Sequence, residues 1–381
     1  MTAARPAVPA DPARPGRTAD PAAAPTPAGR DDVRRRIRAD LGPDAFAPRP
    51  RRALWFLPLA ATSVTCLALL VRASLPWYLA LLLALVLGQT LAAGGFLAHE
   101  VLHGSVVRSR RLQTFLGGIG FLPMGISPGL WRVWHNQMHH AHTNRGSDPD
   151  AFGTLRRYRR ARSTRLVVPL APGSGNPLSA LFLGYWFTFH GQVVLWLQSS
   201  RVRGFARLRR EPAMVAAVAV LATWTAIAVV AGPARAVFAV GVPLVVANTI
   251  TMGYIATNHF MRPMATSNDP LDNSMSVRTW RVLDRLHFNF SHHVEHHLFP
   301  TMSGAETPKV RAWLLAHAPD RYVCPAHGTA IAYLYRTPRV YLDAHTLVNP
   351  TRTRGRARAR VDTAELARVL RSGRRAPAPI R

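Results

Sequence analysis

Residues 53–103 read ALWFLPLAATSVTCLALLVRASLPWYLALLLALVLGQTLAAGGFLAHEVLH. The stretch holds two uncharged apolar runs, 53–71 and 75–98, and ends at two histidines four positions apart, His99 and His103. A helix of about 20 apolar residues spans the hydrocarbon core of a bilayer, which is roughly 30 Å thick. The link between the two runs is too short for anything but a tight turn. We therefore predict a membrane hairpin that returns the histidines to the side from which the chain entered.

A second pair of apolar runs lies at about 213–232 and 236–257, joined by an equally short link. Arginines are abundant before each pair, and basic residues beside membrane segments favour the cytoplasmic side. Each pair is therefore predicted to leave the cytoplasm and return to it. The expected fold class is an all-α integral membrane protein. It has four transmembrane helices in two hairpins, interfacial helices and a cytoplasmic histidine-rich cap, with both termini in the cytoplasm.

Two other uncharged stretches are interrupted too often by glycine and proline to be straight spanning helices. Residues 112–131 contain five glycines and two prolines. A single crossing there would carry the arginines that follow to the outer side, against the charge rule. We predict that this stretch is re-entrant or interfacial and buried against protein. Within the second stretch, 166–200, an apolar helix at about 178–198 is predicted to lie along the cytoplasmic interface.

Composition divides the 381 residues into three parts. Residues 1–52 are rich in Ala, Pro and Arg and are predicted to be a disordered leader with a short helix near Asp32–Ala39. Residues 53–320 form the predicted membrane domain, and 321–381 a cytoplasmic basic tail. The net charge is +29, but no nucleic-acid-binding motif is present, so the charge indicates a rim against anionic lipid. The two cysteines lie far apart in the sequence and predict neither a disulfide framework nor a Cys-based metal site.

The histidines are the candidate functional residues of this sequence, and eight of the 16 occur in three short runs. The runs are His99-Glu100-Val101-Leu102-His103, His135-Asn136-Gln137-Met138-His139-His140 and His293-Val294-Glu295-His296-His297. Imidazole is the commonest side-chain metal ligand because it is neutral near pH 7 and offers an accessible nitrogen. Eight imidazoles are too many for one zinc ion but suit two iron ions.

The spacing within each run fits metal ligands on a helix. Positions i and i+4 share a face, so His99 and His103 can approach the same ion. In the second run His135 and His139 are also four apart. His140 is adjacent to His139, and neighbouring helical residues point about 100° apart, which lets them serve two different ions. The third run repeats this arrangement.

His259 ends the fourth predicted span, where an imidazole beside hydrocarbon requires a partner, and we predict that it is a ninth ligand. The complete predicted metal set is His99, His103, His135, His139, His140, His259, His293, His296 and His297. Three further histidines are assigned to an outer layer or the surface: His142, His287 and His292. The others, His190, His317, His327 and His345, are predicted to have ordinary roles.

The first run alone is ambiguous, because His-Glu-x-x-His is also the zinc-metalloprotease signature, with Glu100 as general base. A protease has no use for six further clustered imidazoles, which makes it the less favoured alternative. A non-catalytic membrane scaffold is a further alternative, and it predicts that replacing His139 or His296 by Ala leaves any phenotype intact. Two irons can instead bind O₂ and, given two electrons, remove hydrogen from an unactivated C–H bond. The substrate would be a long apolar chain, and Trp131, Trp134 and Phe96 either line its channel or anchor the membrane interface.

The sequence resembles the integral-membrane fatty acid desaturases over most of 53–320. The resemblance rests on the three histidine runs, on Asp148-Pro149-Asp150 after the second run and on Leu298-Phe299-Pro300 after the third. It implies that the eight run histidines bind two iron ions (Fe²⁺/Fe³⁺), with His259 joining them. It also implies insertion of a cis double bond into an acyl chain of a lipid or acyl-CoA, with O₂ as co-substrate.

Two departures from the wider family narrow this expectation. No His-Pro-Gly-Gly heme motif occurs, so an external electron donor is implied, a ferredoxin or similar carrier with its reductase. The third run opens with His293 where many front-end desaturases carry glutamine, so the resemblance does not imply a front-end regiochemistry. A related di-iron hydroxylase or ketolase acting on an alkane, sphingolipid or carotenoid is the alternative, since it shares the histidine scaffold.

Overall fold

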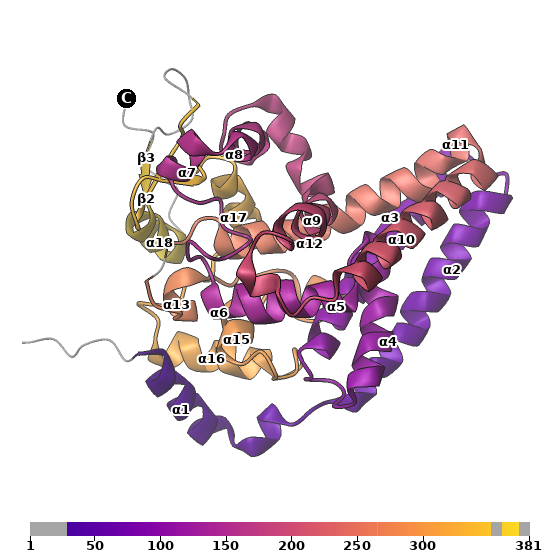
Figure 1. Cartoon of the computed structure of the whole chain (residues 1–381). Helices are drawn as coiled ribbons and strands as arrows, with labels where there is room; N and C mark the ends of the chain where they lie inside the picture. Colours follow the sequence, from indigo (N-terminus) through magenta and orange to yellow (C-terminus); the bar gives the residue numbers. More distant parts are fainter. Residues whose placement is uncertain (1–28, 265, 352–359, 373–381) are drawn as a thin grey trace, which may run out of the picture.

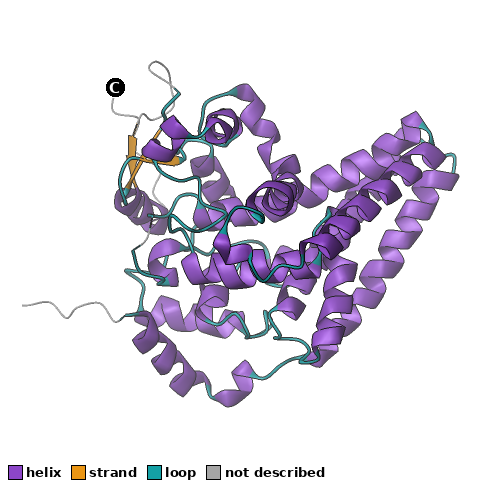
Figure 2. Ribbon diagram, viewed as in Figure 1, coloured by secondary structure: helices purple, strands orange, loops and turns teal. Residues whose placement is uncertain are grey.

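The structure is a computed structural model, and it describes residues 29–264, 266–351 and 360–372. Helices make up most of these residues, and the strands are confined to one corner of the molecule (Figure 2). Four long helical segments form an extended arm, and the shorter elements gather at its base as a cap (Figure 1). The mostly helical architecture confirms the predicted helical fold class, whereas the four-span count and the cytoplasmic cap stay predictions.

The arm contains the four predicted spans. Its helical segments are α2 (Phe56–Arg72), α3 (Trp77–Leu102), α10 (Arg210–Ala231) and the run of α11 (Pro233–Ala236), η9 (Val237–Gly241) and α12 (Val242–His259). Large aliphatic side chains on α2 and α10 are more than half exposed, among them Leu57, Val64, Val215, Leu221 and Val229. Exposed apolar surface of this extent on long helices is expected of a lipid-facing surface.

Five helices among the described residues are long and apolar enough to cross a membrane. The fifth runs from Pro177 to Gln198 and comprises η6 (Pro177–Leu181), α9 (Phe182–Val193) and η7 (Val194–Gln198). It covers the segment predicted to be interfacial. In Figure 1, α9 is seen nearly along its axis, whereas the arm helices extend across the picture. This orientation suits a helix that lies across the spans, and the number of crossings stays a prediction.

The glycine-rich stretch 112–131 forms α4 (Arg110–Phe121), η3 (Leu122–Met124) and α5 (Pro128–Trp131), and α4 packs on α3. The contact is close because both helices place glycines in it: a Cβ on Gly120 would lie 2.2 Å from the Gly94 carbonyl oxygen. At 12 residues α4 is too short to span a bilayer. The structure therefore agrees with a stretch buried against protein.

The short helix predicted near Asp32–Ala39 is confirmed as α1 (Arg30–Leu41), but the rest of residues 29–52 is not disordered as predicted and forms η1 (Pro43–Phe46) and the start of η2 (Pro50–Trp55). Val33 and Ile37 of α1 are buried with Val310 and Leu314 of α16 (Thr307–His317). Two apolar residues one helical turn apart are enough to dock an otherwise charged helix, and composition alone concealed them. Residues 1–28 lie outside the described part of the chain.

Short elements build the cap around the histidine runs. They are η4 (Arg132–His139), α6 (His140–His142), α7 (Leu155–Arg160), α8 (Arg162–Val167), η5 (Val168–Leu170), η8 (Arg203–Phe205), α13 (Pro270–Asn273), α14 (Arg281–Leu286), α15 (His293–Leu298), α16, α17 (His327–Leu334) and α18 (Thr363–Ser372). The sequence also predicts a short amphipathic helix at Thr307–Ala316 and a final helix near Asp362–Arg371, and these correspond to α16 and α18.

The all-α prediction misses a small antiparallel sheet in the cap, of order β1-β2-β3: β1 (Val340–Tyr341), β2 (Thr346–Val348) and β3 (Arg360–Asp362). Val340 pairs with Val348, and Leu347 with Val361. Strands of two or three residues are too short to give a periodic sequence signal. Within the predicted basic tail, residues 321–351 and 360–372 thus pack onto the cap, whereas 352–359 and 373–381 lie outside the described residues.

Candidate metal centre

All nine predicted ligands come together in the cap, in two groups. The first group is His99, His103, His135, His140 and His296, and the second is His139, His259, His293 and His297. Within each group the nitrogens that can bind a metal all lie within 4.8 Å of one another. The first group is partly accessible, because three of its members are half-buried, whereas all four histidines of the second group are buried.

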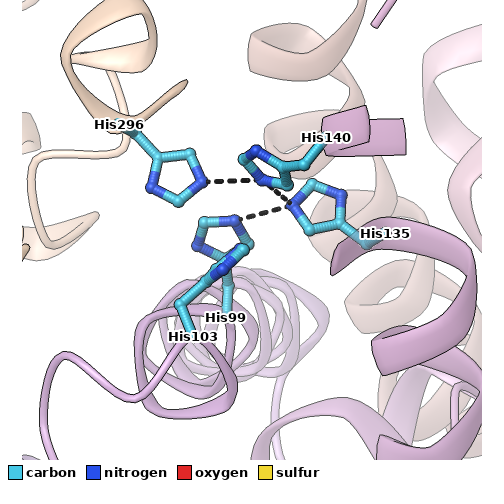
Figure 3. A group of neighbouring side chains, drawn as sticks. All are labelled: His99, His103, His135, His140 and His296. Carbon is cyan, nitrogen blue, oxygen red and sulfur yellow. Dashed lines mark hydrogen bonds between the residues drawn. The ribbon is translucent and has the colours of Figure 1, made fainter. Parts of the chain in front are cut away.

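The rings of the first group point toward a common centre (Figure 3). The Nε2 atom of His135 lies 3.0 Å from that of His99 and 3.1 Å from that of His140, which in turn lies 3.1 Å from Nε2 of His296. In the second group, Nε2 of His293 lies 2.6 Å from Nε2 of His259 and 3.1 Å from Nε2 of His297. Each group is therefore a converging set of imidazole nitrogens drawn from distant parts of the chain.

Two helices supply their ligands by the predicted spacing. His99 and His103 occupy the last turn of α3 and its C-cap, and both face the first group. On α15, His293 and His297 share the second group, while His296 points to the first. The prediction that neighbouring imidazoles serve different groups therefore agrees with the geometry of α15.

The second run departs from α-helical geometry. Its segment η4, eight residues from Arg132 to His139, is a π-helix, in which the hydrogen-bond repeat is i to i+5. His135 and His140, five apart, consequently share the first group, and His139 turns to the second. In an α-helix, His135 and His139 would share one face because they are four positions apart, whereas the π-helix turns them toward different groups. No residue pattern in the run signals a π-helix.

Two carboxylates orient His139 from behind. Its Nδ1 lies 3.1 Å from Oδ1 of Asp148 and 3.3 Å from Oδ2 of Asp150. Burial disfavours the charged imidazole, but the two aspartates outweigh it and raise the pKa of His139. A hydrogen bond from Nδ1–H to a carboxylate leaves Nε2 free as a ligand and makes it more basic. Asp148 is itself held by the backbone N–H groups of Asn144 and Asp150.

His190, predicted to be ordinary, belongs to the same network. Its Nε2 lies 3.0 Å from Oδ1 of Asp150, which also accepts a hydrogen bond from the Trp134 indole at 2.8 Å. The ring of His190 stacks on Trp186. The aspartates follow the second run within eleven residues and were visible as candidates, but nothing in the sequence links His190 to them.

Glu100 does not face an open coordination position. Its Oε2 accepts hydrogen bonds from the Arg52 guanidinium, and its Oε1 accepts from the Ser303 hydroxyl and the Gly304 N–H. Glu295 is similarly bound, by Arg311, Tyr322 and Ser276. Both oxygens of Glu100 are occupied, so it is not placed to act as the general base that the zinc-protease interpretation requires.

The remaining histidines lie outside both groups. His287 lies between the Tyr254 hydroxyl and the Gln89 side chain, and His292 lies beside Ser291. The others are His142, which is half-buried, His317 stacked on Trp313, His327 stacked on Tyr254, and His345. Their assignment to other roles agrees with this placement.

The donor set fits metal ions. Burial and the neighbouring imidazoles lower the pKa values of six of the ligands outside the spans well below the ordinary value, namely His103, His135, His140, His293, His296 and His297. Neutral imidazole is the form that binds a metal. Nε2 of His103 is buried without a hydrogen-bond partner among the described residues, as expected of an atom whose partner is an ion.

A narrow, largely apolar cavity reaches both groups. His135 borders it from the first group, and His139, His259 and His293 border it from the second. Its other walls include Trp131, Trp134, Trp186, Phe187 and Phe260. Of the three residues predicted to line a channel, Trp131 and Trp134 do so. Phe96 does not line this cavity and instead stacks on Phe290.

Long apolar helices joined to one half-buried and one buried group of imidazoles define a membrane protein with a histidine-rich candidate metal centre. A profile of the fatty acid desaturase family matches residues 74–330, well over half of the chain. The chain therefore belongs to the fatty acid desaturase family.

Two curated relatives are similar to part of the chain. An sn-1 oleoyl-lipid 12-desaturase of Picosynechococcus sp. is 35% identical over 92 residues, which cover 24% of this chain and 26% of the relative. An sn-1 oleoyl-lipid 12-desaturase of Anabaena variabilis is 27% identical over 106 residues, covering 28% of this chain and 30% of the relative. The matched region thus spans less than a third of each relative's length.

Proposed function

We propose that this chain is a membrane-bound desaturase that inserts a double bond into the acyl chain of a lipid or an acyl-CoA. The observation that carries the proposal is the pair of adjoining groups of five and four imidazoles beside an apolar cavity. The reaction converts –CH₂–CH₂– to –CH=CH– and reduces O₂ to two waters, which requires two electrons and two protons from outside. A ferredoxin or similar carrier with its reductase would supply the electrons.

The nine histidines would hold two iron ions, one in each group. All-imidazole ligation suits iron, zinc, copper and nickel, but five nitrogens exceed the four that a structural zinc site uses. When bound, the two irons would activate O₂ to an oxidant able to remove hydrogen from an unactivated C–H bond. Asp148 and Asp150 would keep the His139 ring oriented, and their contacts at Nδ1 favour this role.

The cavity walls would orient the substrate and exclude water. Trp131 stacks on the His135 ring with a centroid separation of 4.3 Å, and Trp134 and Phe187 extend the apolar surface away from the metal groups. An acyl chain lying along these rings would pass beside ligands of both groups. Because the cavity is narrow, we expect Trp186 and Phe187 to change rotamer when a chain enters.

The proposed topology has four crossings, with both termini and all three histidine runs in the cytoplasm. The ligands lie at the ends of α3 and α12 that meet the cap, and the tight turns of both hairpins lie at the far tip of the arm (Figure 1). An electron carrier in the cytoplasm would then approach the half-buried first group, while the second group lies deeper.

Expression with a ferredoxin and its reductase, followed by fatty acid profiling, tests the function. We expect a new double bond in the host lipids that is absent with His296→Ala, and about two irons per purified chain. A new hydroxyl or keto group in place of the double bond would support the hydroxylase or ketolase alternative. An unchanged profile from an iron-loaded protein would refute the proposal.

A further inference from the structure

A second hollow lies in the cap and is lined by four arginines. It shares no lining residue with the cavity beside the histidine groups. Arg262 comes from the loop after α12, Arg321 from the loop after α16, and Arg368 and Arg371 from α18. The hollow has a volume of about 390 Å³, and its lining also includes Thr266, Ser267 and two carboxylates, Asp272 and Asp320. Residues more than 100 positions apart thus bring their positive charges to one place.

Arg262 is held rigidly with one end free. It is only 5% exposed. Its Nε and Nη2 donate to the backbone carbonyls of Leu271 and Asp272 at 2.8–3.1 Å. Its Nη1 has no hydrogen-bond partner within the described part of the chain, and Arg262 is among the residues that line the hollow. An arginine fixed in this way presents a pre-oriented donor.

The charges of this hollow are incompletely neutralised. Arg321 pairs with Asp269 and Asp272 at 2.9 and 3.0 Å. Arg368 and Arg371 form no ion pair with any described residue, although the exposed Asp320 lies close enough to influence Arg371. Burial is the main reason that the pKa of Arg262 is lowered to about 10. The charge of Arg371 lowers it as well, whereas the charge of Asp272 acts in the opposite direction. An anion bound among these arginines would reduce the electrostatic repulsion between their guanidinium groups.

We propose that this hollow binds a phosphate-bearing anion, held by Arg262, Arg368 and Arg371. Guanidinium groups bind phosphate oxygens through pairs of charge-assisted hydrogen bonds, and the neighbouring hydroxyls add further donors. The anion is either a soluble phosphate ester or the head group of a phospholipid. Because α18 lies at the opposite end of the molecule from the hairpin tips (Figure 1), the soluble source is favoured.

Binding of the anion would brace the cap beside the metal centre. The Arg262 carbonyl accepts a hydrogen bond from Asn144 at 3.2 Å, and the same amide donates to the carbonyl of His259 at 3.1 Å. The loop that carries Arg262 also holds Asn268, which donates to the His140 carbonyl at 2.7 Å. The hollow is therefore connected to both histidine groups, but its proposed ligand does not depend on the reaction that they perform.

Calorimetric titration of the purified full-length, iron-loaded protein with glycerol 3-phosphate tests the site, with potassium chloride at equal ionic strength as reference. Reversing one charge should remove at least one charge-assisted contact, so Arg371→Glu should weaken binding about tenfold or more. Arg368→Glu should act in the same direction. Arg281→Glu, at an exposed arginine of α14 outside the hollow, is the matched control and should change the affinity less than about twofold.

A parallel experiment uses nanodiscs of phosphatidylglycerol or phosphatidylcholine and measures the lipid that the protein retains after exchange into detergent. Soluble binding that Arg371→Glu abolishes identifies a soluble phosphate ester. Retention of phosphatidylglycerol that the same variant abolishes, without soluble binding, identifies a lipid head group. If Arg371→Glu fails to fold, Arg368→Glu provides the same comparison. Equal binding by wild type and the hollow variants, or none beyond the chloride reference in both arms, would overturn the proposal.

Discussion

Replacing Glu100 by glutamine should loosen the first histidine run from the loop that follows the third. The carboxylate is 7% exposed and accepts four hydrogen bonds, two from Arg52 at 2.7 and 3.0 Å and two from Ser303 and Gly304 at 2.8 and 2.6 Å. An amide has one acceptor oxygen, so two of these donors would face an N–H group. The change also leaves Arg52, whose side chain is 17% exposed, without its partner.

The expected loss of stability is large. Hydrogen bonds to a charged group contribute about 1.5–3 kcal/mol each, and breaking a buried ion pair costs roughly 3–5 kcal/mol. Since Arg52 retains some contact with water, we expect a decrease of about 2–4 kcal/mol in the free energy of unfolding. His99 and His296 should then separate, and iron in the first group should fall more than in the second.

Denaturation monitored in detergent and iron measured per chain are the two assays. Glu306→Gln is the matched control, because Glu306 pairs with Arg49 and Lys309 at 2.7 Å, and these partners are 40% and 59% exposed. The Glu306 side chain is itself only 11% exposed, but because both of its partners reach water, its ion pairs should contribute about 0–1 kcal/mol. Equal stability losses in the two variants, with full iron in both, would refute the reasoning. Lost activity with unchanged stability and metal would instead revive a general-base role for Glu100.

Three further outcomes are expected. Asp148→Asn removes the nearer of the two charged partners of His139 and should weaken iron binding about 10–100-fold, measured by chelator competition; unchanged affinity would contradict the orienting role. Gly120→Ala places a methyl group against the Gly94 carbonyl and should cost about 1–3 kcal/mol in unfolding experiments, whereas Gly129→Ala, whose methyl group would have its nearest neighbour at 4.0 Å, should cost less. The six histidines whose pKa values are lowered on folding bind more protons in the unfolded chain, so the metal-free protein should lose stability as the pH falls below about 6.5. Equilibrium unfolding of the metal-free protein at a series of pH values measures this, and stability that stays flat or rises on acidification would contradict it.

The arm and the ligand set could be predicted from the sequence because both leave strong local signals. Uncharged runs such as 75–98 predict buried or lipid-facing helices, and α3 covers nearly the same residues as that run. The clustered imidazoles of the three runs identify themselves by residue type. His259 could be added because an imidazole at the end of an apolar span requires a partner.

Other features depend on tertiary context. Val33 and Ile37 are the only residues of α1 that are buried, and their partners on α16 lie about 270 positions away. The contact between His190 and Asp150 joins α9 to a loop 40 residues earlier and follows no spacing rule. Whether the segment Pro177–Gln198 crosses the membrane or lies on it depends on its neighbours, because its length and hydropathy permit both.

The π-helix at Arg132–His139 makes the register of the second histidine run unusually sensitive to chain length. Deleting one residue between His135 and His139 would restore ordinary α-helical winding. His135 and His140 would then be four positions apart and still share a face, but His139 would be rotated away from its three partners on α12 and α15. A single-codon deletion would thus be expected to leave the first group complete and the second with three of its four imidazoles, so metal binding should weaken in the second group more than in the first.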